Sequence, residues 1–453
     1  MQTSKQDLEK IVTHLTTKMA AYQKFYDYYK GIHTWNFSSK KFKTKYGQRL
    51  QTLRENLCRT VVKAPASRLQ IINFLAEKQN TENPAWKIWK RNKMPLNSGK
   101  VHREAFKTGE AFVMVWVDKN GRARIETQTA ANVAVWKSAE TGETEKAAKM
   151  WLGTDGKYYL TVYYADRIEK YVSKHKRAQS DSKSFVVREV AGEPFPLGNP
   201  YKRVPVFRFT FDEEADDVPN SILSDVIPLN DALNKSYADI FVGQEYNSMR
   251  QRHVAGLRVE VDEETGKKIE PYKADDSVWI AEDNETKFGE FTDANLESML
   301  KVKQETVKDI ALVSGIPPSY FNLEDSGSAI SGEALRKLEA RFTSIVQDAQ
   351  LSFGEGWDEV IGFAMEIDRE TKTLETKDLQ IETQWTDAAP VSETEILDNA
   401  IKKKSLGWSE EQIQRDYGLT DGQIEKMKEE IANREKAKME TQAKFFDAGN
   451  SNY

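Results

Sequence analysis

The chain has 453 residues, of which 39% are hydrophobic and 30% charged, and its formal net charge at pH 7 is −5. That length suits about three domains, and the acidic balance argues against a protein that grips DNA, because such domains are usually strongly basic. No apolar run approaches the roughly twenty residues that span a bilayer, and the polar N-terminus lacks the apolar segment of a signal peptide, so we expect no membrane segment.

The first part of the chain predicts helices. Residues 4–30 form an amphipathic pattern that Gly31 ends, and residues 49–75 and 85–107 predict two further helices. The stretch 35–46 mixes four lysines with four aromatic residues. We interpret it as a lysine-rich loop over the edge of a core, and single-stranded nucleic-acid binding is the alternative.

The spacing of apolar residues then changes to that of strands. Asn120-Gly121 is a strong hairpin signal, and the segments 111–117 and 122–128 on either side of it alternate as strands do. Residues 31–215 therefore predict a mixed α+β domain. Further strands are expected at 149–152, 158–164, 167–172 and 204–209.

Acidic residues gather at the end of this domain: Asp212, Glu213, Glu214, Asp216 and Asp217. Hard divalent cations prefer oxygen ligands, so a metal-dependent nuclease or related nucleic-acid enzyme is one function that this cluster allows. A solvated linker is the simpler interpretation. The five histidines are scattered without the spacing of metal ligands.

Two long helices are predicted next, on either side of a small insert. The first covers about 220–252, and Pro228 marks a kink or a late start. The second begins at Asp293, whose carboxylate can cap the first turn, and stops before Gly315. The insert between them is acidic, and its strands are expected at 256–261 and 277–281.

A loop and a much longer helix follow. The loop 316–331 carries an aromatic pair and then an acidic, flexible tip. The helix after Ser331 has an apolar stripe of about thirty residues, against a usual helix length of eleven or twelve. Gly354 and Gly356 predict a bend midway along it. Such a helix suits an assembly in which many copies pack side by side around an axis.

The end of the chain predicts one strand at 380–385 and then short helices with capping boxes. A charged helix is predicted over 425–444, and we expect the tail 448–453 to be disordered. The capping boxes pair Ser392 with Glu395, Ser409 with Gln412, and Thr420 with Gln423.

Several short sequences, in this order and spacing, resemble the portal proteins of tailed bacteriophages. They are Val204-Pro205-Val206 through Leu229-Asn230-Asp231-Ala232-Leu233-Asn234, Ser314-Gly315-Ile316-Pro317-Pro318, and Ser328 to Ser331 followed by Gly332-Glu333-Ala334-Leu335. The resemblance implies the portal fold: an α+β wing, long stem helices, a small β clip, a tunnel loop with a long kinked helix, and a helical crown. The implied boundaries are wing 1–219, stem helix 220–252, clip 253–292, second stem helix 293–314, tunnel loop 315–331, long helix and return strand of the wing 332–390, and crown and tail 391–453.

The resemblance also implies a function. A portal is a ring, by family a dodecamer, at one capsid vertex, through which double-stranded DNA enters and leaves. It is a structural protein rather than an enzyme, and it needs no cofactor or metal. The implied partners are a separate terminase and a head–tail adaptor at the clip, and the scaffolding and major capsid proteins at the wing. The implied location is the portal vertex of the virion, after assembly in the host cytoplasm.

The site residues implied by the resemblance lie in the tunnel loop and the second stem helix. In the loop they are Tyr320, Asn322, Glu324, Asp325, Ser326 and Ser328. A repeated ring of Glu324 and Asp325 would repel phosphates, while Lys301 and Lys308 of the stem would offer weak compensating contacts. The simpler interpretation of these lysines is pairing with glutamates of the same helix.

Motifs of known catalytic sites are missing from the sequence. It contains no Walker phosphate loop, no dinucleotide-binding Gly-rich turn after a strand, and no nucleophile elbow. Ser326-Gly327-Ser328 precedes a helix, but the acidic residues around it would repel a phosphate. The single cysteine, Cys58, has no histidine partner in sequence, and it excludes an internal disulfide framework.

Overall fold

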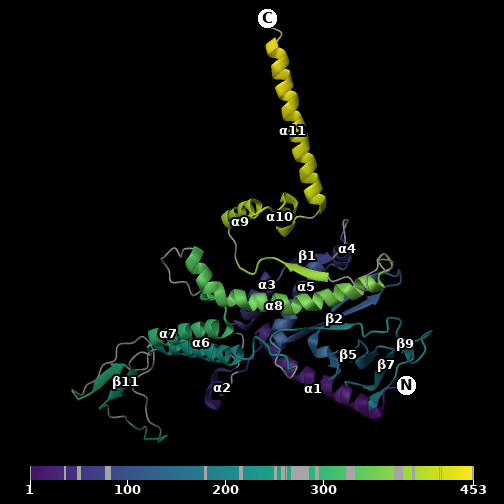
Figure 1. Ribbon diagram of the computed structural model, residues 1–453. Helices are drawn as coiled ribbons and strands as arrows, with labels where there is room; N and C mark the ends of the chain where they lie inside the picture. Colours follow the sequence, from purple (N-terminus) through teal and green to yellow (C-terminus); the bar gives the residue numbers. More distant parts are fainter. Residues whose placement is uncertain are drawn as a thin grey trace. The chain divides into compact units, whose positions relative to one another are not determined.

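The computed structural model describes the chain except residues 1, 35–36, 48–52, 77–82, 178–180, 214–217, 249–251, 257–260, 262, 267–284, 291–294, 323–331, 372–380, 390–392, 418, 420 and 451–453. It divides into two compact units (Figure 1). Unit 1 comprises Met1–Ile32, Asn56–Ile227 and Ala311–Tyr453, and unit 2 comprises His33–Glu55 and Pro228–Ile310. Helices and antiparallel sheets both contribute, which confirms the predicted α+β class.

The N-terminal helix α1 (Lys5–Lys30) agrees with the prediction. The Ser4 side chain accepts a hydrogen bond from the Asp7 amide at its start, and Gly31 ends it with φ 81°. Its apolar stripe packs against one face of the larger sheet, and this packing forms one core of unit 1. The buried stripe consists of Leu8, Ile11, Val12 and Leu15, and the sheet contributes Ala148, Met150, Leu160 and Val162.

Two antiparallel sheets of unit 1 lie in the predicted β region. The larger has six strands in the order β4-β5-β6-β7-β8, with β9 paired to β7, and the smaller has the order β10-β2-β3. The predicted hairpin at Asn120-Gly121 is the β2–β3 turn. The strands β4, β8 and β9 were not predicted, because they are short or lie in polar surroundings. The bounds are β2 (Glu110–Val117), β3 (Ala123–Gln128), β4 (Val133–Lys137), β5 (Thr144–Leu152), β6 (Lys157–Tyr164), β7 (Arg167–Lys176), β8 (Phe185–Val187), β9 (Leu197–Gly198) and β10 (Val206–Thr210).

Three N-terminal predictions were wrong in part. The segment 49–75 holds α3 (Cys58–Arg68) and then β1 (Ile71–Ala76), which pairs with β13 (Ile381–Trp385). The segment 85–107, which was predicted as one helix, contains two, α4 (Pro84–Arg91) and α5 (Met94–Thr108). The chain turns between them at Lys93, which has φ 55°. The expected lysine-rich loop contains a helix, α2 (Lys40–Tyr46). The Ser39 side chain caps its first turn.

The long helix α8 (Gly332–Ile367) is the centre of the second core of unit 1 (Figure 1). Its buried Phe353 and Trp357 contact Phe209 of β10, while its buried Phe342 contacts Tyr320. A Cβ at Gly356 would lie 2.6 Å from the Phe209 ring, so this glycine permits close packing of α8 on β10.

Unit 2 contains most of α6 (Val226–Ser248) and α7 (Leu296–Ser314), together with α2 and the hairpin β11 (Arg252–Ala255)–β12 (Lys287–Glu290). The segment before α3 joins the two long helices through Glu55. The Glu55 backbone forms two hydrogen bonds with the Asn234 side chain of α6. The Glu55 carboxylate lies 2.9 Å from Lys303 Nζ of α7.

The helices of unit 2 are shorter than predicted. α6 begins at Val226 rather than 220, because Pro228 fits only a first turn. The expected cap of the second helix, Asp293, lies outside the described residues, and the Asn295 side chain accepts from the Ser298 amide at the start of α7. Of the strands expected in the insert, 277–281 lies outside the described residues, as does most of 256–261.

The C-terminal segment contains α9 (Glu393–Ser405), α10 (Glu410–Asp416) and α11 (Asp421–Asn450). Ser409 caps α10 as predicted, and Ser392 and Thr420 lie outside the described residues. The tail was expected to be disordered from residue 448, but α11 continues to Asn450. No described helix combines the length and apolar character that crossing a membrane requires.

Candidate channel segment

Lys301 and Lys308 lie exposed on α7, and each forms an ion pair within the helix. Lys301 Nζ lies 2.9 Å from a carboxylate oxygen of Glu297, and Lys308 Nζ lies 2.8 Å from Glu305. Exposed pairs at this spacing stabilise a helix by only about 0.3–0.5 kcal/mol, so solvent or another anion can replace either glutamate at little cost. The pairing matches the simpler interpretation of these lysines.

The turn after α7 is fixed by backbone conformation and burial. Gly315 has φ 69°, and a Cβ there would lie 2.7 Å from the Ile345 side chain. Ile316 is buried, and the 3-10 turn η3 (Pro318–Phe321) then leads to Asn322, whose φ is 56°. The Asn322 side chain is exposed, so the chain leaves the core of unit 1 at this residue.

Tyr320 is held inside unit 1 by Arg68 at the end of α3. Arg68 Nη2 donates to the Tyr320 hydroxyl at 2.5 Å and to Glu339 Oε2 at 3.1 Å, while Nη1 donates to the Ala388 carbonyl at 3.1 Å. The guanidinium also lies over the Phe342 ring, 5.2 Å from its centroid. Burial alone would lower the pKa of Arg68, but Tyr320 and Glu339 raise it overall, so the cation is fixed.

This junction joins three chain segments that are distant in sequence. Arg68 contacts the turn in the first part of the predicted tunnel loop, the first part of α8 and the chain that follows β13. Sequence reasoning missed it, because a single arginine near a helix end carries no signal of partners so far away. Four of the predicted loop residues, Glu324, Asp325, Ser326 and Ser328, lie outside the described residues.

The acidic cluster at 212–217 does not form a metal site in the part of the chain that the structure describes. Glu213 lies 2.6 Å from Arg208 Nη1, and the Asp212 carboxylate accepts from the Asn220 amide at 3.1 Å. The other three acidic residues are not described. Among the described residues, no three His, Cys, Asp or Glu side chains are grouped to hold a metal.

A buried charge network lies beside that cluster. Glu110 of β2 accepts from Arg208 Nε at 2.6 Å and from the Tyr22 hydroxyl at 2.7 Å, and Lys18 Nζ of α1 lies 2.5 Å from its carboxylate. Burial alone would raise the pKa of Glu110, but Lys18 and Arg208 lower it overall. Burial lowers the pKa of Lys18 although Glu110 opposes this. The contacts of Glu110 with both cations tie α1 to the two neighbouring strands.

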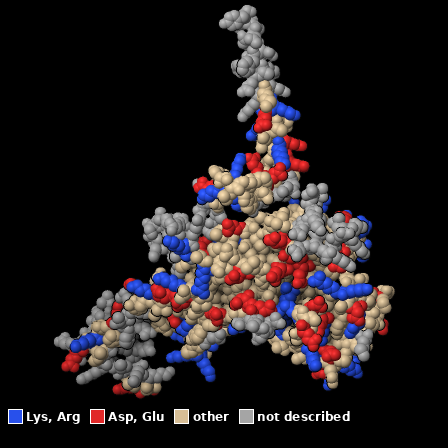
Figure 2. Space-filling model, viewed as in Figure 1, with Lys and Arg blue, Asp and Glu red and all other residues tan. Residues whose placement is uncertain are grey.

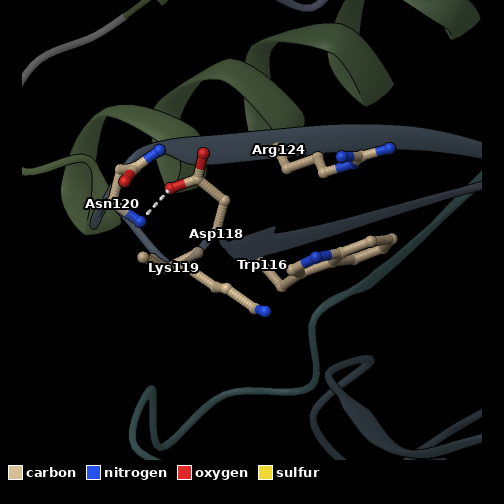
Figure 3. A pocket seen from close by; sticks show the side chains of 6 residues that line it. Trp116, Asp118, Lys119, Asn120 and Arg124 are labelled. Carbon is tan, nitrogen blue, oxygen red and sulfur yellow. Dashed lines mark hydrogen bonds between the residues drawn. The ribbon is translucent and has the colours of Figure 1, made fainter.

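The hollow at the tip of the β2–β3 hairpin is open and about 510 Å³ in volume (Figure 3). The cross-strand pair Trp116 and Arg124 lies on one side of it. The Asn120 amide donates to Asp118 Oδ1 at 2.8 Å, and the Arg122 amide to the same oxygen at 3.0 Å. These two hydrogen bonds stabilise the turn, so the role of Asp118 is to stabilise the β2–β3 hairpin.

Charges of both signs are scattered over the face shown in Figure 2. Among the residues coloured there, no continuous basic surface covers the view. This distribution agrees with the net charge of −5.

Comparison with known proteins gives a consistent result. A sequence model of the family described as "Phage portal protein, SPP1 Gp6-like" matches residues 8–437. The portal protein of Mycobacterium phage D29 is 22% identical over 392 residues, which are 82% of this chain and 77% of that protein. The portal protein of Mycobacterium phage L5 is 30% identical over 162 residues, which are 35% of this chain and 32% of that protein, so this match spans about a third of its length.

Solved structures with a similar chain trace come from the necks of GTA particles. One, titled as the neck of a native particle computed with C12 symmetry, has a TM-score of 0.47 and 10% identity, and the match covers 83% of this chain and 94% of that chain. Another, the neck of an empty particle computed with C6 symmetry, has a TM-score of 0.49 and 11% identity, covering 85% and 95%.

Proposed function

Because the chain belongs to the SPP1 Gp6-like family of phage portal proteins, we propose that its copies close into a ring at one capsid vertex, and that double-stranded DNA enters and leaves through the ring. The family match over residues 8–437 carries this proposal. None of the comparisons supports the alternative, a metal-dependent nuclease, and its acidic cluster lacks a metal site among the described residues.

Exposed apolar side chains on the long helices support packing between copies. On α7, Leu300, Val302 and Leu312 are 47%, 57% and 68% exposed, and Leu351 of α8 is 73% exposed. Burying such side chains contributes about 25 cal/mol for each Å² removed from water. A ring buries one surface of each copy against a different surface of the next, so two unlike patches are needed on every chain.

The channel is proposed to be lined by the loop 315–331, including Asn322, Glu324, Asp325, Ser326 and Ser328, with Tyr320 anchoring its beginning to Arg68. A ring of loop carboxylates limits the sticking of phosphates to the wall. Lys301 and Lys308 exchange their glutamate partners for passing phosphates. The proposed units are the wing 1–219 with 332–390, the stem 220–252 and 293–314, the clip 253–292 and the crown 391–453.

The remaining partners follow from the same role. The protein is structural, without its own enzymatic activity, and a separate terminase supplies the energy of packaging. Terminase and the head–tail adaptor dock on the clip, while the scaffolding and major capsid proteins meet the wing. The ring is assembled in the host cytoplasm and stays at the portal vertex of the virion.

The mass of the purified protein in solution tests this proposal. Light scattering after size exclusion should give a species of several copies, and a dodecamer of the 51.8-kDa chain has a mass of about 620 kDa. A preparation that contains only the 51.8-kDa monomer at every concentration and salt would overturn the proposal.

A further inference from the structure

A pocket of about 290 Å³ opens in unit 1 where the loop before α6, the end of α7 and the middle of α8 meet. Its apolar lining comes from Phe211, Ile222, Val313 and Ile345. Val313, one of these lining residues, is 41% exposed. Part of the apolar lining is therefore open to water in a single copy.

Three carboxylates line this pocket, those of Asp212, Asp225 and Asp348, and each is exposed. The single cation in the lining, Arg341, donates through Nη1 to the Leu312 carbonyl at 2.8 Å. Among the described residues, neither Asp225 nor Asp348 has a cation within ion-pair distance. Apolar walls with an uncompensated acidic rim fit the side chain of lysine or arginine, whose methylenes pack while its charge stays at the rim.

The same chain carries an unmatched basic surface on α2 in unit 2. Phe42 and Tyr46 anchor this helix: Lys235 of α6 lies over the Phe42 ring, and the Tyr46 hydroxyl lies 3.1 Å from that of Tyr246. Three other lysines of this helix lie outside these contacts. Lys40, Lys41 and Lys43 are exposed, and none has a carboxylate partner in the part of the chain that the structure describes.

We propose that α2 of one copy docks at the acidic pocket of the next copy in the ring. Lysines of α2 enter the pocket and meet Asp225 and Asp348, while the exposed side chain of Val313 in the lining is covered. This inference rests on the proposed ring. In each contact of that ring, α2 of one copy and the acidic pocket of the next are the two unlike surfaces. The occupant is a second copy because one chain offers both members of the pair, as a head-to-tail contact requires.

The test uses two charge-reversed variants of the full chain. The pocket variant carries Asp225→Lys and Asp348→Lys, and the helix variant carries Lys40→Glu, Lys41→Glu and Lys43→Glu. Each variant alone brings like charges together at every contact, so the concentration for half-assembly should rise by roughly tenfold or more. Mixed in equal amounts, the two variants should restore rings, because every contact in an alternating ring then joins opposite charges.

Circular dichroism and thermal unfolding first establish that both variants fold. The control reverses Lys5, Lys10 and Lys24, which are exposed lysines of α1, and it should leave assembly unchanged.

If the wild-type chain forms no ring, the proposed function fails. If the wild type forms rings but the variants assemble normally, or the mixture gives no rescue, this inference fails alone. Normal assembly of the helix variant with weaker binding of a labelled DNA duplex would make α2 a DNA contact and overturn the inference.

Discussion

Arg68 and Tyr320 are 252 positions apart in sequence, yet Arg68 Nη2 donates a 2.5 Å hydrogen bond to the Tyr320 hydroxyl. The same guanidinium donates to Glu339 and to the Ala388 carbonyl. One side chain thus contacts the first part of the proposed tunnel loop, the first part of α8 and the chain that follows β13. This contact therefore adds to the local constraints of Gly315 and Ile316 at the start of the loop.

Replacing Arg68 with lysine should destabilise unit 1. Lysine keeps the charge but cannot reach three partners with a planar fork, so we expect a loss of about 1–3 kcal/mol in the free energy of unfolding. Urea unfolding of Arg68→Lys measures this loss. Arg59→Lys is the control, because Arg59 is an exposed arginine that lies over the Tyr29 ring. Equal unfolding midpoints for the two variants would contradict the role assigned to Arg68.

His102 should make stability depend on pH. It is buried, its Nε2 accepts from Trp357 Nε1 at 3.0 Å, and burial and the charge of Arg103 lower its pKa to about 3. Between pH 6.5 and about 3 the unfolded chain binds a proton here that the folded chain does not. The free energy of unfolding should therefore fall as pH falls through this window, by up to about 1.4 kcal/mol per pH unit.

His102→Gln isolates this contribution. Glutamine does not titrate, and its side-chain oxygen can accept from the Trp357 indole. Unfolding in urea at several values between pH 7 and 4.5 should give a shallower pH slope for this variant than for the wild type. The control is His175→Gln at an exposed position of β7, whose slope should match the wild type. Equal slopes for all three proteins would show that His102 binds its proton equally in the folded and unfolded chains, which would contradict the prediction.

Glu110 should be among the costliest carboxylates to neutralise. Glu110→Gln leaves Lys18 and Arg208 without their shared anion in a buried site, and breaking such a network costs about 3–5 kcal/mol. Glu126→Gln is the control, because its partner Arg124 is 58% exposed and an exposed pair contributes at most about 1 kcal/mol. Guanidinium unfolding compares them, and a loss below 1 kcal/mol for Glu110→Gln would rule the network out as a major support.

Deleting residues 322–328 should leave assembly intact but impair DNA packaging, because Arg68 still fixes Tyr320 while the proposed wall of the channel is lost. A Gly-Ser segment of equal length in place of 323–328 separates the effect of charge from that of length. The measurement is the amount of DNA protected from nuclease inside cognate capsids. An undiminished yield with the deletion would count against the tunnel assignment.

Local patterns predicted the elements whose stabilising contacts lie nearby. The cap at Ser4 with the stop at Gly31, and the turn at Asn120-Gly121, are confirmed because short-range backbone chemistry decides them. The strand β1 was predicted as part of a helix, since a short apolar run has no distinguishing period and its partner β13 is far along the chain. The segment of α2 was predicted as a loop because of its lysine content, although Ser39 is a residue type that favours the start of a helix.

The candidate site was less predictable from sequence than the fold. The sequence suggested glutamate partners for Lys301 and Lys308, because residues three and four positions apart share a helix face. It gave no indication that Tyr320 is held by Arg68, because that contact depends on tertiary packing. The acidic pocket was equally hidden, since Asp225 and Asp348 come together only when α8 folds against the loop before α6.

The central claim is that copies of this chain surround a hole wide enough for DNA, and electron microscopy of the purified full-length protein tests it most directly. Negatively stained particles should be rings with a central opening and rotational symmetry. Fields that contain only compact single subunits, with no ring in any preparation, would contradict the account.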